Sequence, residues 1–188
     1  MSKKLDLALV IDVESTCWEH PPPRGQTSEI IEVGLCVVDL RLLERRERRS
    51  IMVKPMSSEV GEFCTQLTGI TADMVNDAAP LAEALRILRE EYHSCDRLFA
   101  SWGDYDRNQF LRNCHTYNLK YPFGPTHLNI KNLFSTALGL ANELEIDAAC
   151  DRVGIRMEGS HHRGVDDAWN IAQLLCLLLK RTRRASLK

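Results

Sequence analysis

Two carboxylates, Asp12 and Glu14, stand at the end of a short apolar segment near the start of the chain. Side chains alternate between the two faces of a strand, so these two acids would point the same way. Neighbouring carboxylates repel each other and lose hydration at a strand end, and a bound divalent cation relieves both costs. Their hard oxygen ligands suit Mg²⁺ or Mn²⁺. The alternative is that the strand simply ends here and both acids face water.

A second group of acids, Asp104 and Asp106, lies where an apolar segment turns into a helical pattern. An acid at such a junction lies beside the end of a sheet, where sites tend to form. Asp104 is well placed to cap the helix, which would be a structural role. Asp106 lies in the first turn of the same helix. The residue types alone leave open which of the two belongs to a site.

A third group of polar residues, 161–167, precedes a long amphipathic helical pattern and includes His161 and His162. Asp167, in the first turn of that helix, could point at a metal ion, while His162 in the loop could reach a nearby water. The alternative is that Asp166 caps the helix, Asp167 interacts favourably with its dipole, and the histidine is incidental.

Taken together, the three groups supply four carboxylates and a histidine, which match a two-metal phosphodiester site. Two ions about 3.5–4 Å apart can hold the attacking water and stabilise the leaving oxygen. A histidine whose pKa lies near the working pH would take the proton from that water.

The elements expected around these residues indicate one α/β domain over residues 1–188, with a mixed sheet and helices packed on it. Apolar and β-branched runs predict strands at residues 5–13, 30–40, 48–54, 97–101 and 127–130. The first three would form an antiparallel meander, with the arginine-rich segment 41–49 as a hairpin connection. Helical spacing predicts helices at residues 60–67, 72–76, 80–92, 104–117, 131–140, 143–153 and 166–183.

The composition indicates a globular protein that works in a reducing compartment. Of the 188 residues, 44% are hydrophobic, yet no apolar run approaches the roughly 20 residues that span a membrane. The apolar segment at residues 5–11 contains Asp6 and lacks a small-residue cleavage site, which argues against a signal peptide. The seven cysteines form no Cys-x-x-Cys pair, which argues against a disulfide framework or zinc ribbon. We therefore expect a cytoplasmic protein that binds no membrane.

The charge is unevenly distributed, although the net value is only −2. Residues 180–188 carry five basic residues and no acid, which leaves 19 basic against 26 acidic residues over 1–179. Residues 41–49 hold five arginines and two glutamates. An acidic body with basic patches suits an enzyme that holds cations and handles a polyanion. The alternative for each patch is ordinary solvated surface, and the C-terminal patch could equally be a frayed helix end.

The pattern Asp12-x-Glu14, then Asp106, then His162-x4-Asp167 resembles the DEDD 3′→5′ exonuclease superfamily. The histidine places the resemblance in the DEDDh subgroup, which includes proteins like RNase T and the DNA polymerase III epsilon subunit. Closer similarity to the histone-mRNA 3′ exonuclease and RNA-interference-regulating group is carried by residues 12–17, 29–32, 63–71 and 162–172. The similarity covers almost the whole chain.

That resemblance implies an RNase H-like fold that binds two Mg²⁺ or Mn²⁺ ions. It implies that His162 is the general base and that the metal ligands are Asp12, Glu14, Asp106 and Asp167. The family's spacing selects Asp106 over Asp104, and it selects His162 and Asp167 over His161 and Asp166.

Substrate contacts are expected from Ser15, Thr16, Trp18, Leu67, Thr68 and Trp102. Of these, Leu67 and Thr68 belong to the segment 67–70, which resembles the family loop that receives the terminal nucleotide. Leu67 would wedge against the last base, and backbone groups nearby would meet the 3′ hydroxyl. The alternative for this loop is an ordinary helix-ending turn at Gly69. Trp18 could stack on a base, which any base tolerates, or it could serve in packing.

The expected activity is metal-dependent removal of nucleoside 5′-monophosphates from the 3′ end of RNA or single-stranded DNA. Three alternatives remain: a DNA-repair or proofreading exonuclease of the same fold, a non-catalytic nucleic-acid-binding module, and a magnesium phosphatase acting on small nucleotides. The sequence does not choose between the two sugars, because recognition of a 2′ hydroxyl depends on geometry.

Overall fold

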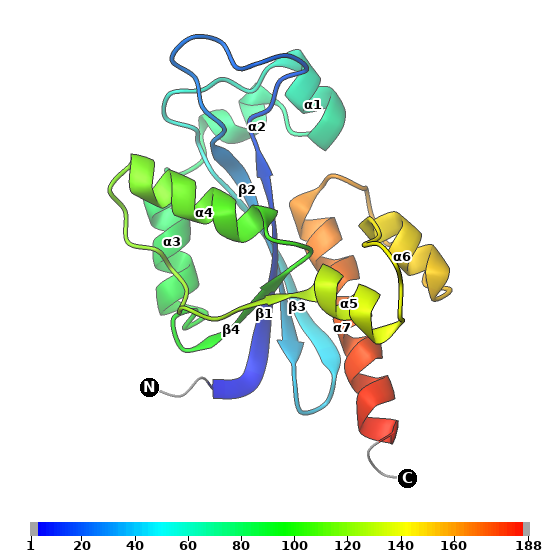
Figure 1. The fold of residues 1–188 in the computed structure, drawn as a ribbon. Helices are drawn as coiled ribbons and strands as arrows, with labels where there is room; N and C mark the ends of the chain where they lie inside the picture. The colour runs from blue at the N-terminus through cyan, green and yellow to red at the C-terminus, as the bar shows by residue number, and fades with distance from the viewer. Residues whose placement is uncertain (1–3, 186–188) are drawn as a thin grey trace.

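The central strand of the sheet is β1 (Lys4–Ser15), which carries Asp12 and Glu14 toward its C-terminal end (Figure 1). It pairs antiparallel with β2 (Ile30–Asp39) and parallel with β4 (Arg97–Ser101). The edge strands are β3 (Glu44–Met52) beside β2 and β5 (His127–Asn129) beside β4. The sheet is therefore mixed, with an antiparallel meander followed by parallel strands, as predicted.

The computed structural model describes residues 4–185. The helices of this part are α1 (Glu62–Thr68), α2 (Ala72–Asn76), α3 (Leu81–Glu90), α4 (Tyr105–Thr116), α5 (Ile130–Ala137), α6 (Ile146–Arg152) and α7 (Gly164–Ala185). Lys188, the last residue of the basic C-terminal patch, lies outside the described residues. Within them, no helix is both long and apolar enough to cross a membrane.

Alternation along β1 separates two hydrophobic cores, one on each face of the sheet. Ala8 and Val10 pack with residues of α5, α6 and α7, whereas Leu9, Ile11 and Val13 pack with residues of α3 and α4. The helices lie accordingly on opposite sides of the sheet (Figure 1). Because side chains of a strand alternate, the next even-numbered residues of β1 face the side on which α7 lies. The period of the strand thus directs both carboxylates toward the last helix.

The arginine-rich segment is part of a strand, which differs from the prediction. β3 begins at Glu44 and not at residue 48, and the turn before it includes Leu43, whose φ is 58°. Ion pairs join Arg46 to Asp39 at 2.5 Å and Arg49 to Glu91 at 2.6 Å. Acidic partners therefore neutralise arginines of this edge strand, and the sequence pattern does not reveal those partners.

The last helix is longer than predicted at its N-terminal end. It begins at Gly164, two residues before the predicted start, and remains helical through Ala185. Near its other end, the Arg183 guanidinium donates hydrogen bonds to the carbonyl oxygens of Arg41 (2.9 Å) and Leu40 (2.5 Å). The basic C-terminal patch is thus partly tied to the β2–β3 turn.

All seven cysteines are free thiols, and five of them are buried. The other two are Cys17, which is half-buried, and Cys95, which is exposed. In the part of the chain that the structure describes, the fold is held by packing and hydrogen bonds.

A contact between two glycines sets the distance between α7 and the sheet. A Cβ atom at Gly34, in β2, would lie 1.9 Å from the backbone carbonyl carbon of Gly164. A Cβ atom at Gly164 would lie 2.8 Å from the carbonyl oxygen of Asp12. Only glycine allows this approach of backbone to backbone. The N-terminus of α7 consequently rests directly on β1 and β2 beside the carboxylates.

Replacing Gly34 with alanine is expected to lower the free energy of unfolding by about 3 kcal/mol or more, because backbone atoms cannot move aside as a flexible side chain can. Urea denaturation followed by circular dichroism would measure the change. Gly61→Ala is the matched control, since a Cβ atom there meets nothing within 4 Å. The control should cost less than about 1 kcal/mol. Similar losses in both variants would contradict the packing argument.

Candidate active site

A cavity of about 270 Å³ opens at the C-terminal end of β1, between α1, the first turn of α4, and the N-terminal ends of α6 and α7. Its lining includes all five residues expected at the catalytic centre: Asp12, Glu14, Asp106, His162 and Asp167. Opposite Glu14, the pairing of β1 with β2 shifts register between Glu14 and Ser15. Such irregularities are frequent next to active sites, where they redirect side chains.

The structure distinguishes Asp106 from Asp104. Asp106 is only 3% exposed, lines the cavity, and accepts a hydrogen bond at Oδ1 from the backbone N–H of Val13 at 2.9 Å. Asp104 is exposed, and its carboxylate lies 3.5 Å from His127 and 3.2 Å from the amide nitrogen of Asn129. Asp104 occupies the N-cap position of α4, but its side chain makes no capping hydrogen bond. Only Asp106 is therefore placed to act in the cavity.

Asp12, Glu14 and Asp167 form a group in which one carboxylate oxygen from each residue lies within 4.8 Å of the other two. Asp167 is 4% exposed and accepts a hydrogen bond at Oδ2 from the backbone N–H of His162 at 2.8 Å. Its other oxygen, Oδ1, is buried without a hydrogen-bond partner among the residues that the structure describes. A buried carboxylate oxygen without a donor, beside two further carboxylates, fits a hard divalent cation such as Mg²⁺ or Mn²⁺.

Burial and mutual repulsion raise the pKa values of these carboxyls. Burial, followed by the charges of Asp106, Glu14 and Asp167, raises the pKa of Asp12 well above its ordinary value. Burial, followed by the charges of Asp167, Glu32 and Asp106, raises the pKa of Glu14 to about 9. Burial raises the pKa of Asp106 to about 7 and that of Asp167 to about 6. Strongly raised pKa values in a cavity are typical of functional sites, and a bound cation would favour the ionised forms.

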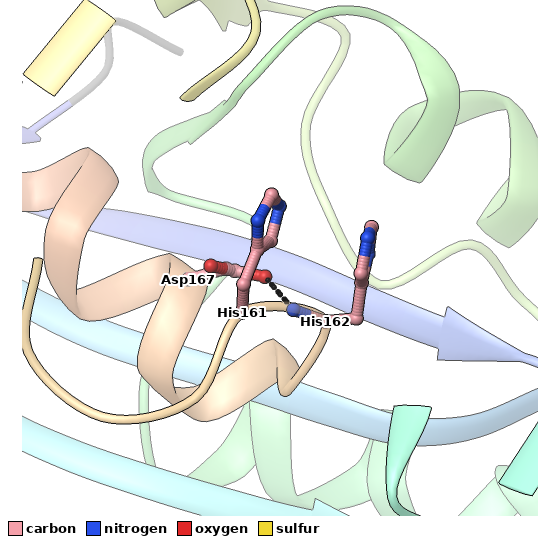
Figure 2. A group of neighbouring side chains, drawn as sticks. All are labelled: His161, His162 and Asp167. Atoms are coloured by element: carbon pink, nitrogen blue, oxygen red, sulfur yellow. Dashed lines mark hydrogen bonds between the residues drawn. The ribbon is translucent and has the colours of Figure 1, made fainter. Parts of the chain in front are cut away.

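The loop before α7 presents two histidines to the cavity, His161 and His162 (Figure 2). Their rings stack with centroids 4.1 Å apart and planes 16° apart. His162 has a φ of 61°, an uncommon backbone conformation for a residue other than glycine. Burial, and then the charge of His161, lower the pKa of His162, so its ring is neutral and able to accept a proton near neutral pH. Both histidines line the cavity, and the choice of His162 over His161 as the catalytic histidine stays a prediction.

Asp166 faces away from this cavity. Its carboxylate accepts a hydrogen bond from the backbone N–H of Ser160 at 2.7 Å and forms an ion pair with Arg48. Asp166 therefore fixes the loop before α7 against the edge strand, while Asp167, one residue later, faces the site.

Glu32 is a buried acid to which sequence reasoning gave no role. It has no exposed surface and accepts hydrogen bonds from the backbone N–H of Gly164 at 3.1 Å and from Nε of Arg163 at 3.3 Å. It also accepts a hydrogen bond from the Ser50 hydroxyl at 2.5 Å. Glu32 thus ties β2 and β3 to the first residue of α7. A single charge inside the apolar run of residues 30–38 was the signal that could have revealed it.

Four of the six predicted substrate-contacting residues line the cavity, namely Ser15, Leu67, Thr68 and Trp102. Leu67 is 42% exposed at the end of α1, and Gly69, with a φ of 70°, ends that helix. The helix-ending turn and the cavity wall are therefore the same segment. Tyr105, Glu145 and Ile146 also line the cavity, although no sequence signal pointed to them.

Thr16 and Trp18 are not among the residues that line this cavity, and their contact with the substrate stays a prediction. Thr16 is fully buried, and its hydroxyl accepts a hydrogen bond from the backbone N–H of Glu29 and lies 3.3 Å from the carbonyl oxygen of Thr27. It therefore holds together the two ends of the loop between β1 and β2. Trp18 is half-buried in the same loop.

A sequence model of the exonuclease family RNase_T matches residues 9–175. That span contains all five residues expected at the catalytic centre.

Two named proteins are similar to this chain over most of its length. The 3′-5′ exoribonuclease 1 of Rattus norvegicus is 29% identical over 188 residues, which cover 93% of this chain and 53% of the relative. The 3′-5′ exonuclease Snipper of Drosophila melanogaster is 25% identical over 194 residues, which cover 92% of this chain and 69% of the relative. The chain thus spans about half the length of the exoribonuclease that it matches.

Among solved structures, the fold is similar to the nuclease domain of 3′hExo, described as a DEDDh family member bound to rAMP. The TM-score is 0.86 at 25% identity, with 96% of this chain and 95% of that chain covered. This similarity confirms the predicted RNase H-like fold class.

In the metal-free protein, stability is expected to fall as the pH rises above about 5. The folded state favours the protonated carboxyls, so their contribution is fully present below their ordinary pKa values of 3.8 to 4.5. It is lost as the pH rises through the raised pKa values of about 6 for Asp167, about 7 for Asp106 and about 9 for Glu14. Thermal unfolding in chelator across this pH range would measure the effect as a falling Tm.

Asp12→Asn is the matched variant for this measurement, because it removes one of the repelling charges without changing the size of the side chain. Its Tm in chelator at pH 8 should exceed that of the wild type, and saturating Mg²⁺ should raise the wild-type Tm more than that of the variant. A variant that unfolds at a lower temperature than the wild type under these conditions would argue against charge repulsion in the site.

Proposed function

The chain belongs to the exonuclease family RNase_T, and we propose that it is a metal-dependent nuclease. In this proposal it removes nucleotides from the 3′ end of RNA. The observation that carries the proposal is that four carboxylates and a histidine, contributed by distant parts of the chain, line one cavity. The proteins named above as exoribonuclease and exonuclease support the direction of cleavage.

In the proposed mechanism, Asp12, Glu14, Asp106 and Asp167 hold two divalent cations, Mg²⁺ or Mn²⁺. When bound, such ions supply a water of lowered pKa and stabilise negative charge on phosphate oxygens. The buried carboxylates are suited to this role because they repel one another strongly until cations neutralise them. The products would be nucleoside 5′-monophosphates.

His162 is the proposed general base. Its ring is on the cavity side of the loop, and the bond from its backbone N–H to Asp167 holds its backbone against the carboxylate group (Figure 2). The lowered pKa leaves the ring neutral near neutral pH, so a ring nitrogen can accept the proton of an attacking water.

The end of α1 is the proposed wall against the terminal nucleotide. Leu67 offers an exposed apolar surface beside Thr68 and Ser15, while Trp102 lies on the cavity lining with its indole N–H donated to the carbonyl oxygen of Leu144. An apolar side chain and a fixed aromatic ring accept any base, which suits a nuclease that degrades a polymer stepwise.

We propose RNA as the preferred polymer because the Rattus norvegicus protein that is 29% identical to this chain is named an exoribonuclease. Incubation of a 5′-labelled single-stranded RNA and its DNA counterpart with Mg²⁺, Mn²⁺ or chelator would test it. A metal-dependent ladder that shortens from the 3′ end, faster on RNA and absent for Asp12→Asn, is the expected result. Intact RNA and DNA in every metal would overturn the proposal and favour a binding module.

Asp106 and Asp104 provide a matched pair for the assignment of the metal ligands. Asp106→Asn is expected to lower kcat about a thousandfold or more, because the members of such a site act as a unit. Asp104→Asn, which changes a carboxylate outside the cavity, should stay within about threefold of the wild type. Single-turnover cleavage of the same RNA would measure both. Equal losses in the two variants would show that the assignment of Asp106 is incorrect.

A further inference from the structure

His161, His162 and Asp167 form a second group of possible metal ligands, with a donor set different from that of the carboxylates. One ligand atom from each residue lies within 4.8 Å of the other two. Both rings rise from the loop before α7, beside the Asp167 carboxylate (Figure 2). The group offers two imidazole nitrogens and one carboxylate oxygen, whereas Asp12, Glu14 and Asp167 offer oxygen alone.

We propose that His161, His162 and Asp167 form an inhibitory site for Zn²⁺. Imidazole nitrogen suits Zn²⁺, while Mg²⁺ prefers oxygen and retains its waters. Two histidines and one carboxylate are also an established set of three protein ligands for Zn²⁺, with the fourth position left to water. The two sites therefore select between metals by the chemistry of their donors.

Asp167 belongs to both groups, and it has a buried oxygen that is open to a cation in either one. Its Oδ1 atom is buried without a hydrogen-bond partner among the described residues, although the side chain is only 4% exposed. Its Oδ2 atom is fixed by the backbone N–H of His162. Asp167 is thus a rigid anchor with one free oxygen, and such an oxygen favours a bound cation.

The rings can reach the geometry that Zn²⁺ requires. Ligand atoms about 2.1 Å from a tetrahedral ion lie roughly 3.4 Å apart, and those of the unbound group all lie within 4.8 Å of one another. The stacked rings place their nitrogens side by side, so binding requires a rotation that makes the lone pairs converge. Both histidines are exposed, and exposed side chains change rotamer on the picosecond to nanosecond timescale.

Inhibition follows from the residues that the two sites share, and this part of the inference rests on the proposed function. A nitrogen of His162 bound to Zn²⁺ cannot accept a proton from water. The free oxygen of Asp167, once bound to Zn²⁺, would no longer be available to the ions that the oxygen-only group holds. Zn²⁺ is therefore expected to inhibit cleavage even when Mg²⁺ is in excess.

Direct metal binding tests the site without any activity. Zn²⁺ affinity would be measured by competition with a chromogenic chelator, in buffer with excess Mg²⁺, for the wild type, His161→Ala and His115→Ala. His115 is an exposed histidine on α4, away from the cavity, and serves as the matched control. His161→Ala should weaken binding about tenfold or more, and His115→Ala should leave it unchanged. Equal affinities in all three proteins would overturn the proposal.

Replacing Zn²⁺ with Co²⁺ would identify the ligand atoms by absorption spectroscopy. This control is needed because the seven free thiols of the chain could also bind the metal. Visible absorption that is lost in His161→Ala supports nitrogen and oxygen ligands, whereas intense thiolate-to-metal absorption in the near ultraviolet would overturn the assignment. In the cleavage assay, His161→Ala should require about tenfold more Zn²⁺ for half inhibition. Binding that follows this pattern in a protein without nuclease activity would refute the proposed function alone.

Discussion

Four carboxylates that repel one another lie around one cavity, and each has lost much of its contact with water. A folded chain holds such an arrangement only when other interactions oppose the repulsion. The N–H of Val13 binds Asp106, and the N–H of His162 binds Asp167, so the backbone itself neutralises part of the charge. The remaining repulsion is what a divalent cation would relieve, which links the affinity for metal to the instability of the site without it.

Close packing of backbone on backbone makes this arrangement possible. The contact between Gly34 and Gly164 brings the start of α7 against the sheet, and Glu32 holds it there through the N–H of Gly164. A buried acid therefore has two effects. It positions the loop that carries His162, and its charge adds to those that raise the pKa of Asp167.

Strand alternation was sufficient to predict that Asp12 and Glu14 share a face, because the period of a strand is a local property. The choice of Asp106 over Asp104 required the family's spacing, since either acid could occupy the first turn of α4. Trp18 is close in sequence to the carboxylates but is not on the cavity lining, because proximity in sequence does not determine the path of a loop. Some features depend on partners far along the chain, such as the ion pairs of the β3 arginines and the place of α6 residues on the cavity lining. The sequence around these residues does not reveal those partners.

The position of the site's residues along the chain has a consequence for its synthesis. Asp12 and Glu14 lie on the first strand of the described fold, whereas His162 and Asp167 are synthesised only with the start of the helix that packs on that strand. The cavity cannot assemble before this long-range contact forms, and contacts of that kind are made late in folding. A chain translated only as far as α6 would therefore lack His162 and Asp167, and it could not form the carboxylate group that we propose as the metal site.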